Sequence, residues 1–530
     1  MLRSSAALLL ALVFTPAASA ELFLPAVFGD GMVLQRDRPV AVFGKADPGA
    51  DVKADFAGGV AQGRADEDGR FRLELPKLEA SAEPRTLTVT SGGETKTFGD
   101  VLVGEVWVCS GQSNMQWSVN SALSAEVEAA SANHPDLRLF QIPLVTAAEP
   151  AEDVDASWKA ASPQTVPGFS AVGYYFARTM HQTLGVPVGM IQTAWGGTRA
   201  EAWTPKEALA AEPELEPILS TWEERIAAYD GAAAMAKFQQ QKAAHAKKLE
   251  AWKRKAKEDR VAAGRPPRAP QKPSDPNTDR HRYSTLYNKM VHPIVPYGIR
   301  GAIWYQGESN SGRAVQYRTL MATLIQSWRD AWGYDFPFYQ VQLANFKATS
   351  DRPQESDWAE LREAQAIAAE RVGNADVAVI TDIGAAKDIH PKNKQDVAKR
   401  LARLALTDVH GMKMTRKGPT LKDVSYDGGK ATLTFDNIGE GGLRGLVTYY
   451  NEPLTGFAIT GEDRVWRWAD AKVTKADTVV LSHPEVKEPV AVRYNWADNP
   501  QGTLFNKAYL PAAPFRTDDF PEVTKDNVKP

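Results

Sequence analysis

"EVWVCSGQSNMQW" (105–117) opens the part of the chain that decides the fold, because an apolar, β-branched run leads directly into a turn of glycine and polar residues. Four further apolar runs follow, with helical periodicity between them. They are "VPVGMIQT" (186–193), "IRGAIWYQ" (299–306), "FPFYQVQL" (336–343) and "ADVAVITD" (375–382). Strands that alternate with helices form a parallel sheet with helices on both faces. We therefore expect an α/β domain on a five-stranded parallel sheet, with any ligand beyond the carboxyl ends of its strands.

Two β-rich regions flank this α/β region. Short alternating runs separated by turn residues fill 21–100, and the same patterning returns over 415–516, so we expect a β-sandwich on each side of a domain spanning 101–410. Within that domain, 206–280 is rich in Ala, Glu and Lys and then in proline, which predicts a solvated helical insertion with an extended linker. The polar tail, 517–530, is expected to fray.

The first twenty residues have the pattern of a secretory signal. Arg3 precedes an apolar run of about ten residues, and Ala18-Ser19-Ala20 forms a small-x-small cleavage pattern. The apolar run is too short to span a membrane. We expect residues 1–20 to be a cleaved signal peptide and the mature chain to be secreted or periplasmic, without a membrane anchor.

Composition excludes several classes of function. A formal net charge of −3 over 530 residues gives no general reason to expect nucleic acid or an anionic membrane as a partner. Cys109 is the single cysteine, so no intramolecular disulfide can form, and we expect it to be a small buried hydrophobe. The chain has no HExxH motif and its histidines are dispersed, so we expect neither a metal nor another cofactor.

Short polar segments follow four of the five predicted strands. They are "SGQSN" (110–114), "AWGGTRAEAW" (194–203), "QGESN" (306–310) and "DIGAAKDIHP" (382–391). Together they supply a hydroxyl, a glycine pair, an asparagine and an Asp-x-His, which are the parts needed for acyl transfer. Gly-x-Ser-Asn occurs twice, so Ser113 and Ser309 are both candidate nucleophiles. We favour Ser113, whose amide would lie at a helix N-terminus, where an oxyanion is stabilised.

His390 is the candidate base. It alone among the eight histidines follows a predicted parallel strand with an acid, Asp388, two residues before it. Leu401 and Leu404 belong to an apolar helical pattern that would hold this segment in place. Asp382 or a backbone carbonyl is the alternative partner if Asp388 does not orient the imidazole.

Four of these strings also carry a family resemblance. "GQSNM", "WGGT" followed by "EAW", "RGAIWYQGESN", and "DIHP" followed by "NK" resemble the SGNH (GDSL-like) hydrolase superfamily, and within it the bacterial sialate O-acetylesterase-like proteins. "FGDGMVLQRDRPVAVFG" near the start and "PVAVRYNWADNP" and "LPAAPFRTDDF" near the end extend the resemblance over almost the whole mature chain. The resemblance implies a flavodoxin-like catalytic domain, a Ser-His-Asp site without metal, and removal of acetyl groups from carbohydrates.

The resemblance implies roles for single residues. Ser113 matches the family nucleophile, and its amide is one donor to the oxyanion. Gly196 or Gly197 would supply the second donor, and the side chain of Asn310 the third. His390 matches the family base.

The orienting acid departs from the superfamily pattern. The superfamily places this acid three residues before the base, but position 387 is lysine here. Asp388, two residues before His390, is therefore a shifted assignment.

The substrate expected from these features is an acetylated carbohydrate. Trp195 and Arg199 follow the second strand and would suit a sugar face and a carboxylate, and we also expect Gln112 to contact substrate. Two rival interpretations remain at this point: a non-catalytic glycan-binding protein, and a lipase or thioesterase of the same fold.

Overall fold

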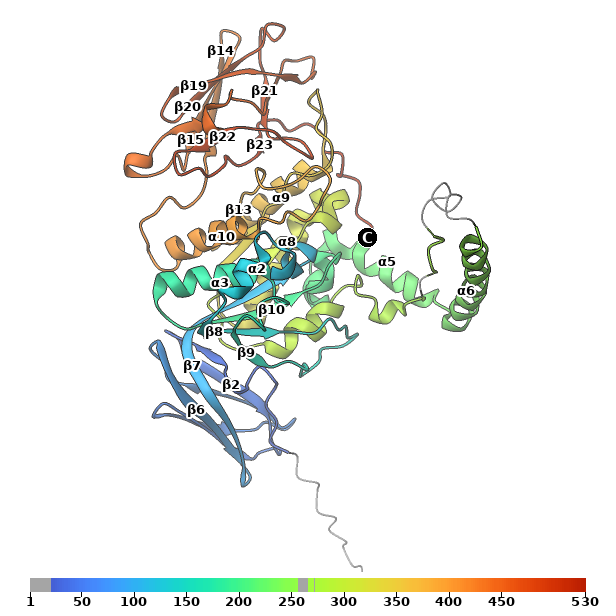
Figure 1. The fold of residues 1–530 in the computed structure, drawn as a ribbon, viewed down its shortest axis with the longest axis vertical. Helices are drawn as coiled ribbons and strands as arrows, with labels where there is room; N and C mark the ends of the chain where they lie inside the picture. Colours follow the sequence, from blue (N-terminus) through green and yellow to red (C-terminus); the bar gives the residue numbers. More distant parts are fainter. Residues whose placement is uncertain (1–20, 256–265, 271) are drawn as a thin grey trace, which may run out of the picture.

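The computed structural model describes residues 21–255, 266–270 and 272–530. A β-rich region, an α/β region and a second β-rich region follow one another along the longest axis, and helix α6 stands out to one side (Figure 1). The predicted signal peptide, residues 1–20, lies outside the described residues. Within the described ranges, no helix has both the length and the apolarity to cross a bilayer.

The N-terminal region consists mainly of antiparallel strands. Its strands are β1 (Val33–Gln35), β2 (Val40–Lys45), β3 (Asp51–Phe56), β4 (Gly59–Arg64), β5 (Arg70–Leu75), β6 (Ser81–Ser91) and β7 (Glu94–Gly111). Among the described strands of this region, only β1 pairs in parallel, with β7. In β5 every second residue is buried, because successive side chains of a strand point to opposite faces. β7 is 18 residues long and pairs antiparallel with β6 before it enters the central sheet.

The central sheet has the order β13-β12-β11-β7-β10-β8-β9. Its further strands are β8 (His134–Gln141), β9 (Trp158–Ala161), β10 (Val188–Ala194), β11 (Gly301–Tyr305), β12 (Phe338–Val341) and β13 (Ala375–Ala378). All five predicted runs contribute strands and lie side by side. The predicted five-stranded sheet is nevertheless too small, because β8 adds a sixth parallel strand and β9 an antiparallel edge.

The sequence of β8 explains why it was missed. "HPDLRLFQ" has proline at its second position and carries two charged residues, which is unusual for a parallel strand buried on both faces. Arg138, at its centre, is buried because its guanidinium pairs with Asp100 at the join between the two sheets. The charge of Arg138 is therefore stabilised by Asp100 of β7, which the sequence of β8 alone does not reveal.

Helices cover both faces of the sheet and create two separate cores. α3 (Ala171–Leu184) packs against α10 (Lys394–Asp408), and α8 (Ala314–Trp332) packs against α9 (Asp357–Val372). Alternation along β7 sends Trp107 and Cys109 into the core with α3 and α10, while Val106 and Val108 enter the other core. Cys109 is completely buried, as predicted, and burial raises the pKa of its thiol.

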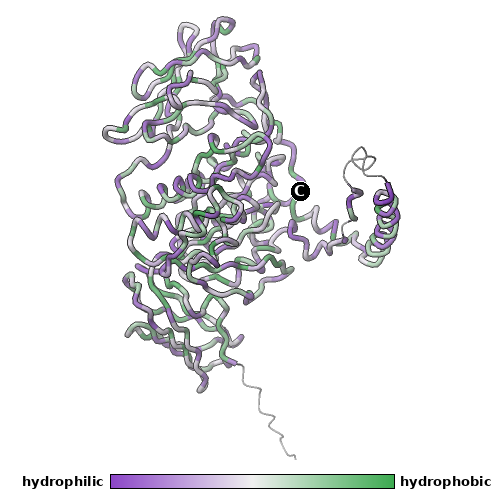
Figure 2. Tube along the Cα trace, in the orientation of Figure 1, coloured by the Kyte–Doolittle hydropathy of each residue, from purple (hydrophilic) through white to green (hydrophobic). Residues whose placement is uncertain are grey.

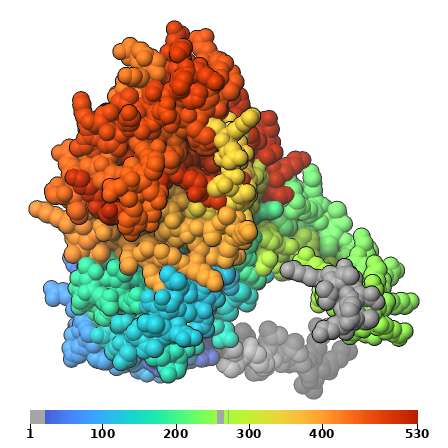
Figure 3. All heavy atoms as spheres, turned by 45° about the horizontal axis from the view of Figure 1, so that its top comes forward, coloured from blue at the N-terminus to red at the C-terminus, as the bar shows by residue number. Residues whose placement is uncertain are grey.

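The insertion is mainly helical from 206 to 253, whereas its described proline-rich residues 266–270 and 272–275 have no regular secondary structure. Its helices are α4 (Lys206–Ala210), α5 (Glu216–Ala227) and α6 (Gly231–Lys253). α5 buries Ile218 and Trp222, whereas α6 buries no side chain and stands clear of the body (Figure 3). Hydrophilic residues are prominent along α6, while hydrophobic residues concentrate in the interior of the body (Figure 2).

The C-terminal region is a second antiparallel β structure around its own core. One sheet contains β14 (Thr420–Asp427), β15 (Lys430–Asp436), β20 (Thr478–Ser482) and β19 (Asp470–Lys475). Another contains β18 (Arg467–Trp468), β17 (Phe457–Thr460), β21 (Ala491–Tyr494) and β23 (Phe515–Arg516). β16 (Leu446–Thr448) and β22 (Leu504–Asn506) form a two-stranded ribbon.

The tail that follows β23 does not fray. It runs back from the C-terminal region to the α/β region and ends beside α5 (Figure 1). Thr524 is 1% exposed and its side chain and amide both donate to the buried carboxylate of Glu360. The expectation of a frayed tail was wrong because composition does not reveal a buried carboxylate that is distant in the sequence.

Candidate active site

The turn that carries Ser113 is fixed by backbone contacts to the neighbouring strand. Gly111 ends β7 with φ +134°, and a Cβ there would lie 2.3 Å from the carbonyl oxygen of Tyr305, so only glycine fits. The amide of Gln112 donates to that same carbonyl at 2.9 Å. Ser113 then begins the short helix α1 (Ser113–Gln116). The carboxyl edge of the sheet thus presents Ser113 at a helix start, as the sequence predicts.

His390 reaches Ser113 across 277 residues of sequence. Its Nε2 lies 2.9 Å from Ser113 Oγ, which is hydrogen-bond distance. The imidazole stacks on the Trp117 ring at 4.6 Å and 14°, which fixes its plane. Burial and the nearby Lys394 lower the pKa of His390, with Asp388 opposing them. The neutral imidazole is therefore favoured near neutral pH and can accept the Ser113 proton.

Asp388 lies close to His390 but does not bond to its ring in this structure. Its Oδ1 accepts the backbone N–H of His390 at 2.9 Å, whereas Oδ1 and Nδ1 are 3.8 Å apart. The second distance exceeds that of a hydrogen bond. The alternative acid, Asp382, is engaged by the guanidinium of Arg400 through two hydrogen bonds of 2.6 and 2.7 Å.

Asn114 links the segment of the nucleophile to that of the base. Its Nδ2 donates to the carbonyl of Ile389 at 3.0 Å and to Glu308 Oε1 at 2.6 Å. Its Oδ1 accepts a hydrogen bond from Lys394 Nζ. Asn114 and Lys394 are both fully buried. The residue after Ser113 thereby holds the residue before His390, which sets the separation of the two reacting side chains.

Three further residues of the site, Asn114, Glu308 and Lys394, were not predicted, although they lie in or next to the polar segments that follow the strands. Burial lowers the pKa of Lys394 to about 7 and raises that of Glu308. Glu308 Oε2 has no hydrogen-bond partner in the described part of the chain. A buried lysine and a buried glutamate beside a predicted catalytic pair are a signal of a functional site, but their burial is not visible in the sequence.

The glycine pair lies against the nucleophile. A Cβ on Gly196 would lie 3.2 Å from Ser113 Cβ, so the close approach requires glycine. The Gly196 amide donates to Gln116 Oε1 at 2.7 Å, whereas Gly197, at φ +74°, has no amide partner among the residues described.

Asn310 is held rigidly in a buried polar network. Its Oδ1 accepts hydrogen bonds from the Ala200 amide at 3.0 Å and from Gln306 Nε2 at 2.6 Å. Its Nδ2 donates to Glu201 Oε2 at 2.9 Å, and Glu201 in turn pairs with Arg313. A side-chain amide carries two N–H donors, so one remains for another acceptor.

The predicted substrate-binding residues do not all have the same environment. Gln112 is 3% exposed, and its Oε1 accepts the Ser309 amide at 3.3 Å, so it lies behind the surface. Trp195 is half-buried, with the Arg280 guanidinium 5.8 Å from its ring.

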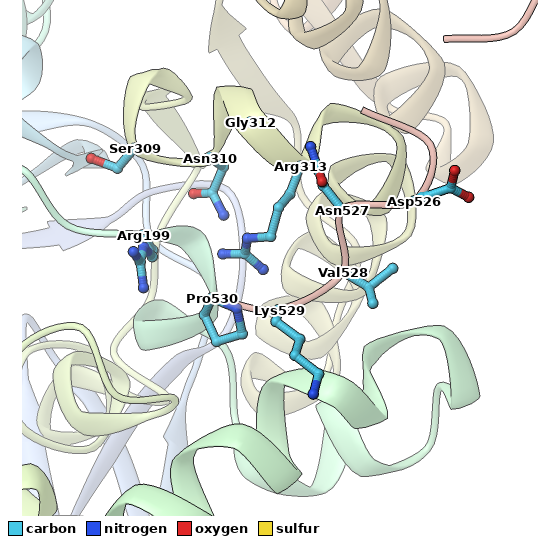
Figure 4. Close-up of a pocket in the computed structure, with 10 residues that line it drawn as sticks. All are labelled: Arg199, Ser309, Asn310, Gly312, Arg313, Asp526, Asn527, Val528, Lys529 and Pro530. Carbon is cyan, nitrogen blue, oxygen red and sulfur yellow. The ribbon is translucent and has the colours of Figure 1, made fainter. Parts of the chain in front are cut away.

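Arg199 has no hydrogen bond or ion pair to any described residue, and burial lowers its pKa. Arg199, Ser309 and Asn310 line a pocket of about 530 Å³ (Figure 4).

Comparisons with known proteins identify several similar carbohydrate esterases. The family model described as "Carbohydrate esterase, sialic acid-specific acetylesterase" matches residues 103–262 and 271–407. The sialate O-acetylesterase of Mus musculus is 28% identical over 78% of this chain and 77% of its own length, and that of Homo sapiens is 27% identical over 78% and 75%. A crystal structure of a carbohydrate acetylesterase from Xanthomonas citri is 34% identical, with a TM-score of 0.77, and covers 94% of this chain and 100% of its own.

The site and these similarities define a carboxylic ester hydrolase that acts on carbohydrate esters. The chain belongs to the carbohydrate esterase family of sialic acid-specific acetylesterases.

We expect Lys394→Met to move the acid limb of the kcat/KM profile to higher pH. In the predicted role of His390 as general base the imidazole must be neutral, so activity is expected above the pKa of His390 and is lost as pH falls through it. The positive charge of Lys394 lowers that pKa, and its removal raises it. Hydrolysis of 4-nitrophenyl acetate from about pH 4 to about pH 8 measures the shift.

Lys399→Met is the matched control, since Lys399 lies on the same helix but is exposed. It should leave the acid limb unchanged. A Lys394→Met profile that coincides with that of the wild type contradicts the electrostatic role.

Proposed function

We propose that the protein is a serine esterase that removes O-acetyl groups from carbohydrates without a metal, through an acyl-enzyme intermediate. The observation that carries this proposal is the 2.9 Å separation of Ser113 Oγ and His390 Nε2 at the carboxyl edge of the sheet. A hydroxyl in hydrogen-bond contact with a neutral imidazole is an activated nucleophile.

In the first half of the reaction, His390 Nε2 takes the proton of Ser113 as Oγ attacks the ester carbonyl carbon. The resulting oxyanion accepts hydrogen bonds from the Ser113 amide, from the amide of Gly196 or Gly197, and from Asn310 Nδ2. The free amide of Gly197 favours it over Gly196, whose N–H already has an acceptor in Gln116. His390 then protonates the sugar oxygen, the C–O bond breaks, and the sugar leaves.

In the second half, His390 removes a proton from water, which attacks the acetyl-Ser113 ester. The second tetrahedral intermediate collapses, Ser113 recovers its proton from His390, and acetate is released. Asp388 is the proposed orienting acid. Its 3.8 Å separation from Nδ1 must shorten when the imidazolium forms, because the charge on the ring then attracts the carboxylate.

The proposed substrate is an acetyl ester on sialic acid or on a plant polysaccharide. The sialate O-acetylesterases and the carbohydrate acetylesterase similar to this chain support an acetylated sugar. Trp195 offers a flat apolar surface and Arg199 a cation without an ion-pair partner among the described residues. Gln112, which was also predicted to contact substrate, is buried, and we propose that it supports the Ser309 segment instead. The pattern of residues 1–20 supports secretion or export to the periplasm.

We also propose that the catalytic domain has the flavodoxin-like arrangement of SGNH hydrolases. Its five predicted strands lie in the spatial order β10-β7-β11-β12-β13, which in chain order is 2-1-3-4-5. In this interpretation β8 and β9 are additions beyond β10. The domain boundaries proposed are those given by the sequence, at 21–100, 101–410 and 415–516.

We expect Ser113→Ala to lower kcat by about 10⁴-fold or more, because the covalent step is lost while binding remains. Ser309→Ala is the matched control from the second Gly-x-Ser-Asn segment. It keeps the backbone contact to Gln112 and should retain activity within about tenfold. Equal losses in the two variants would remove the support for Ser113 as nucleophile.

We expect 4-nitrophenyl acetate to be cleaved with a higher kcat/KM than 4-nitrophenyl octanoate. The proteins similar to this chain are acetylesterases, which supports a two-carbon acyl group as the one that is cleaved best. Initial rates at equal concentrations provide the comparison. A clear preference for octanoate would favour a lipase or thioesterase instead.

A further inference from the structure

The tail after β23 forms a strap, defined here as residues 518–530, that joins the C-terminal region to the α/β region. It is tied at its start by ion pairs. Arg493 pairs with Asp518 at 2.8 Å, and Glu522 pairs with both Arg516 and Arg318, the last at 2.6 Å. Arg318 belongs to α8, so these charges connect the strap directly to the α/β region.

A buried anchor fixes the middle of the strap. Glu360 of α9 is completely buried and accepts the amide of Val523 at 2.7 Å, the amide of Thr524 at 3.1 Å and the Thr524 hydroxyl at 2.6 Å. The Thr524 hydroxyl also accepts the Val315 amide at 3.2 Å. A carboxylate buried in this way needs these donors, so the strap has a defined path and is not a loose end.

The last residues of the strap connect to the network that holds Asn310. The carbonyl of Val528 accepts a hydrogen bond from Gln316 Nε2 at 2.9 Å, and Gln316 Oε1 accepts one from Arg313 at 2.6 Å. Arg313 pairs with Glu201, which accepts the Asn310 amide. The strap therefore touches the same chain of buried groups that positions a proposed oxyanion donor.

Residues 526–530 form one wall of the pocket that contains Arg199 (Figure 4). Arg199, Ser309 and Asn310 form the facing wall, and the Asn527 side chain points toward Arg313. This pocket borders the candidate active site through Asn310, the proposed oxyanion donor, which is one of its lining residues. Its volume of about 530 Å³ is within the range of about 300–1,000 Å³ found for small-molecule sites.

We propose that residues 526–530 form a subsite for the sugar part of the substrate, so that the strap contributes to specificity and not to the chemical step. The inference rests on the proposed function, since it places a glycosyl unit beside the acetyl ester at Ser113. Asn527, the backbone of the strap and the unpaired Arg199 provide donors and acceptors for hydroxyl or carboxylate groups. A small acetyl ester without a sugar does not reach this wall.

Removal of residues 526–530 tests the subsite, because the anchor at Val523 and Thr524 is retained. Kinetics are measured on 4-nitrophenyl acetate, 9-O-acetylated sialic acid and acetylated xylo-oligosaccharides. For the glycan ester that the wild type cleaves best, we expect KM to rise about fivefold or more with kcat nearly unchanged. For 4-nitrophenyl acetate we expect a clearly smaller loss in kcat/KM than for the glycan ester, because Gln316 loses only its bond to Val528 and keeps those to Glu214 and Arg313.

Two point variants make the test independent of the truncation. Asn527→Ala, inside the pocket, should raise KM for the same glycan ester in the same direction. Lys525→Ala, at an exposed position of the strap outside the pocket, should change neither substrate. If the truncated chain does not fold, as judged by its melting temperature, the pair Asn527→Ala and Lys525→Ala decides the question.

Two results contradict the proposed subsite. In the first, the truncated enzyme or Asn527→Ala loses activity on both kinds of ester by the same factor. In the second, neither change alters the kinetics on either kind of ester. A wild type that cleaves 4-nitrophenyl acetate but neither glycan ester overturns the subsite as well. A wild type that cleaves none of the three esters contradicts the proposed function itself, which separates the two failures.

Discussion

The site depends above all on the hydrogen bonds of the Asn114 side chain. Ser113 and His390 are 277 residues apart in the sequence, and the backbone hydrogen bond from Leu123 to Lys392 joins their segments only beyond these two residues. Asn114 supplies the link, since it bonds to the carbonyl that precedes His390, to Glu308 and to Lys394. Because a displacement of about 1 Å can cost about 10²-fold in rate, this buried amide is the main constraint on the reacting geometry.

The same arrangement determines the electrostatics of the base. Lys394 is buried in order to reach Asn114, and its charge lies close enough to lower the pKa of His390. Burial also lowers the pKa of Lys394 itself to about 7. Asn114 thus holds the segment of His390 in position, and the charge of Lys394, which is bonded to Asn114, favours the neutral imidazole. The neutral imidazole is the form that a general base needs.

A second buried network connects the site to the C-terminal region. Glu201 is completely buried between Asn310 and Arg313, and loss of one partner of such a pair typically costs about 3–5 kcal/mol. Arg313 reaches the strap through Gln316. The wall of the pocket and the proposed oxyanion donor are therefore parts of one rigid structure that extends from the sheet edge to the tail of the chain.

The sequence predicted those parts of the fold and site that depend on local pattern. The five apolar runs became strands, and the segments after them brought Ser113 and His390 together, because parallel strands end at one edge. The parts that it missed depend on partners distant in the sequence. Arg138 in β8 is buried through Asp100, the strap is held by Glu360, and Lys394 is buried against Asn114. None of these pairings leaves a periodic or compositional signal.

Covalent trapping of the nucleophile tests the central claim most directly. The protein is treated with a fluorophosphonate, digested, and examined by mass spectrometry of its peptides. We predict a single adduct on Ser113 in the wild type, and its loss in a His390→Ala variant, because the hydroxyl is activated by the imidazole at 2.9 Å. An adduct on Ser309 with Ser113 unmodified, or labelling of Ser113 that is unchanged without His390, would contradict the account.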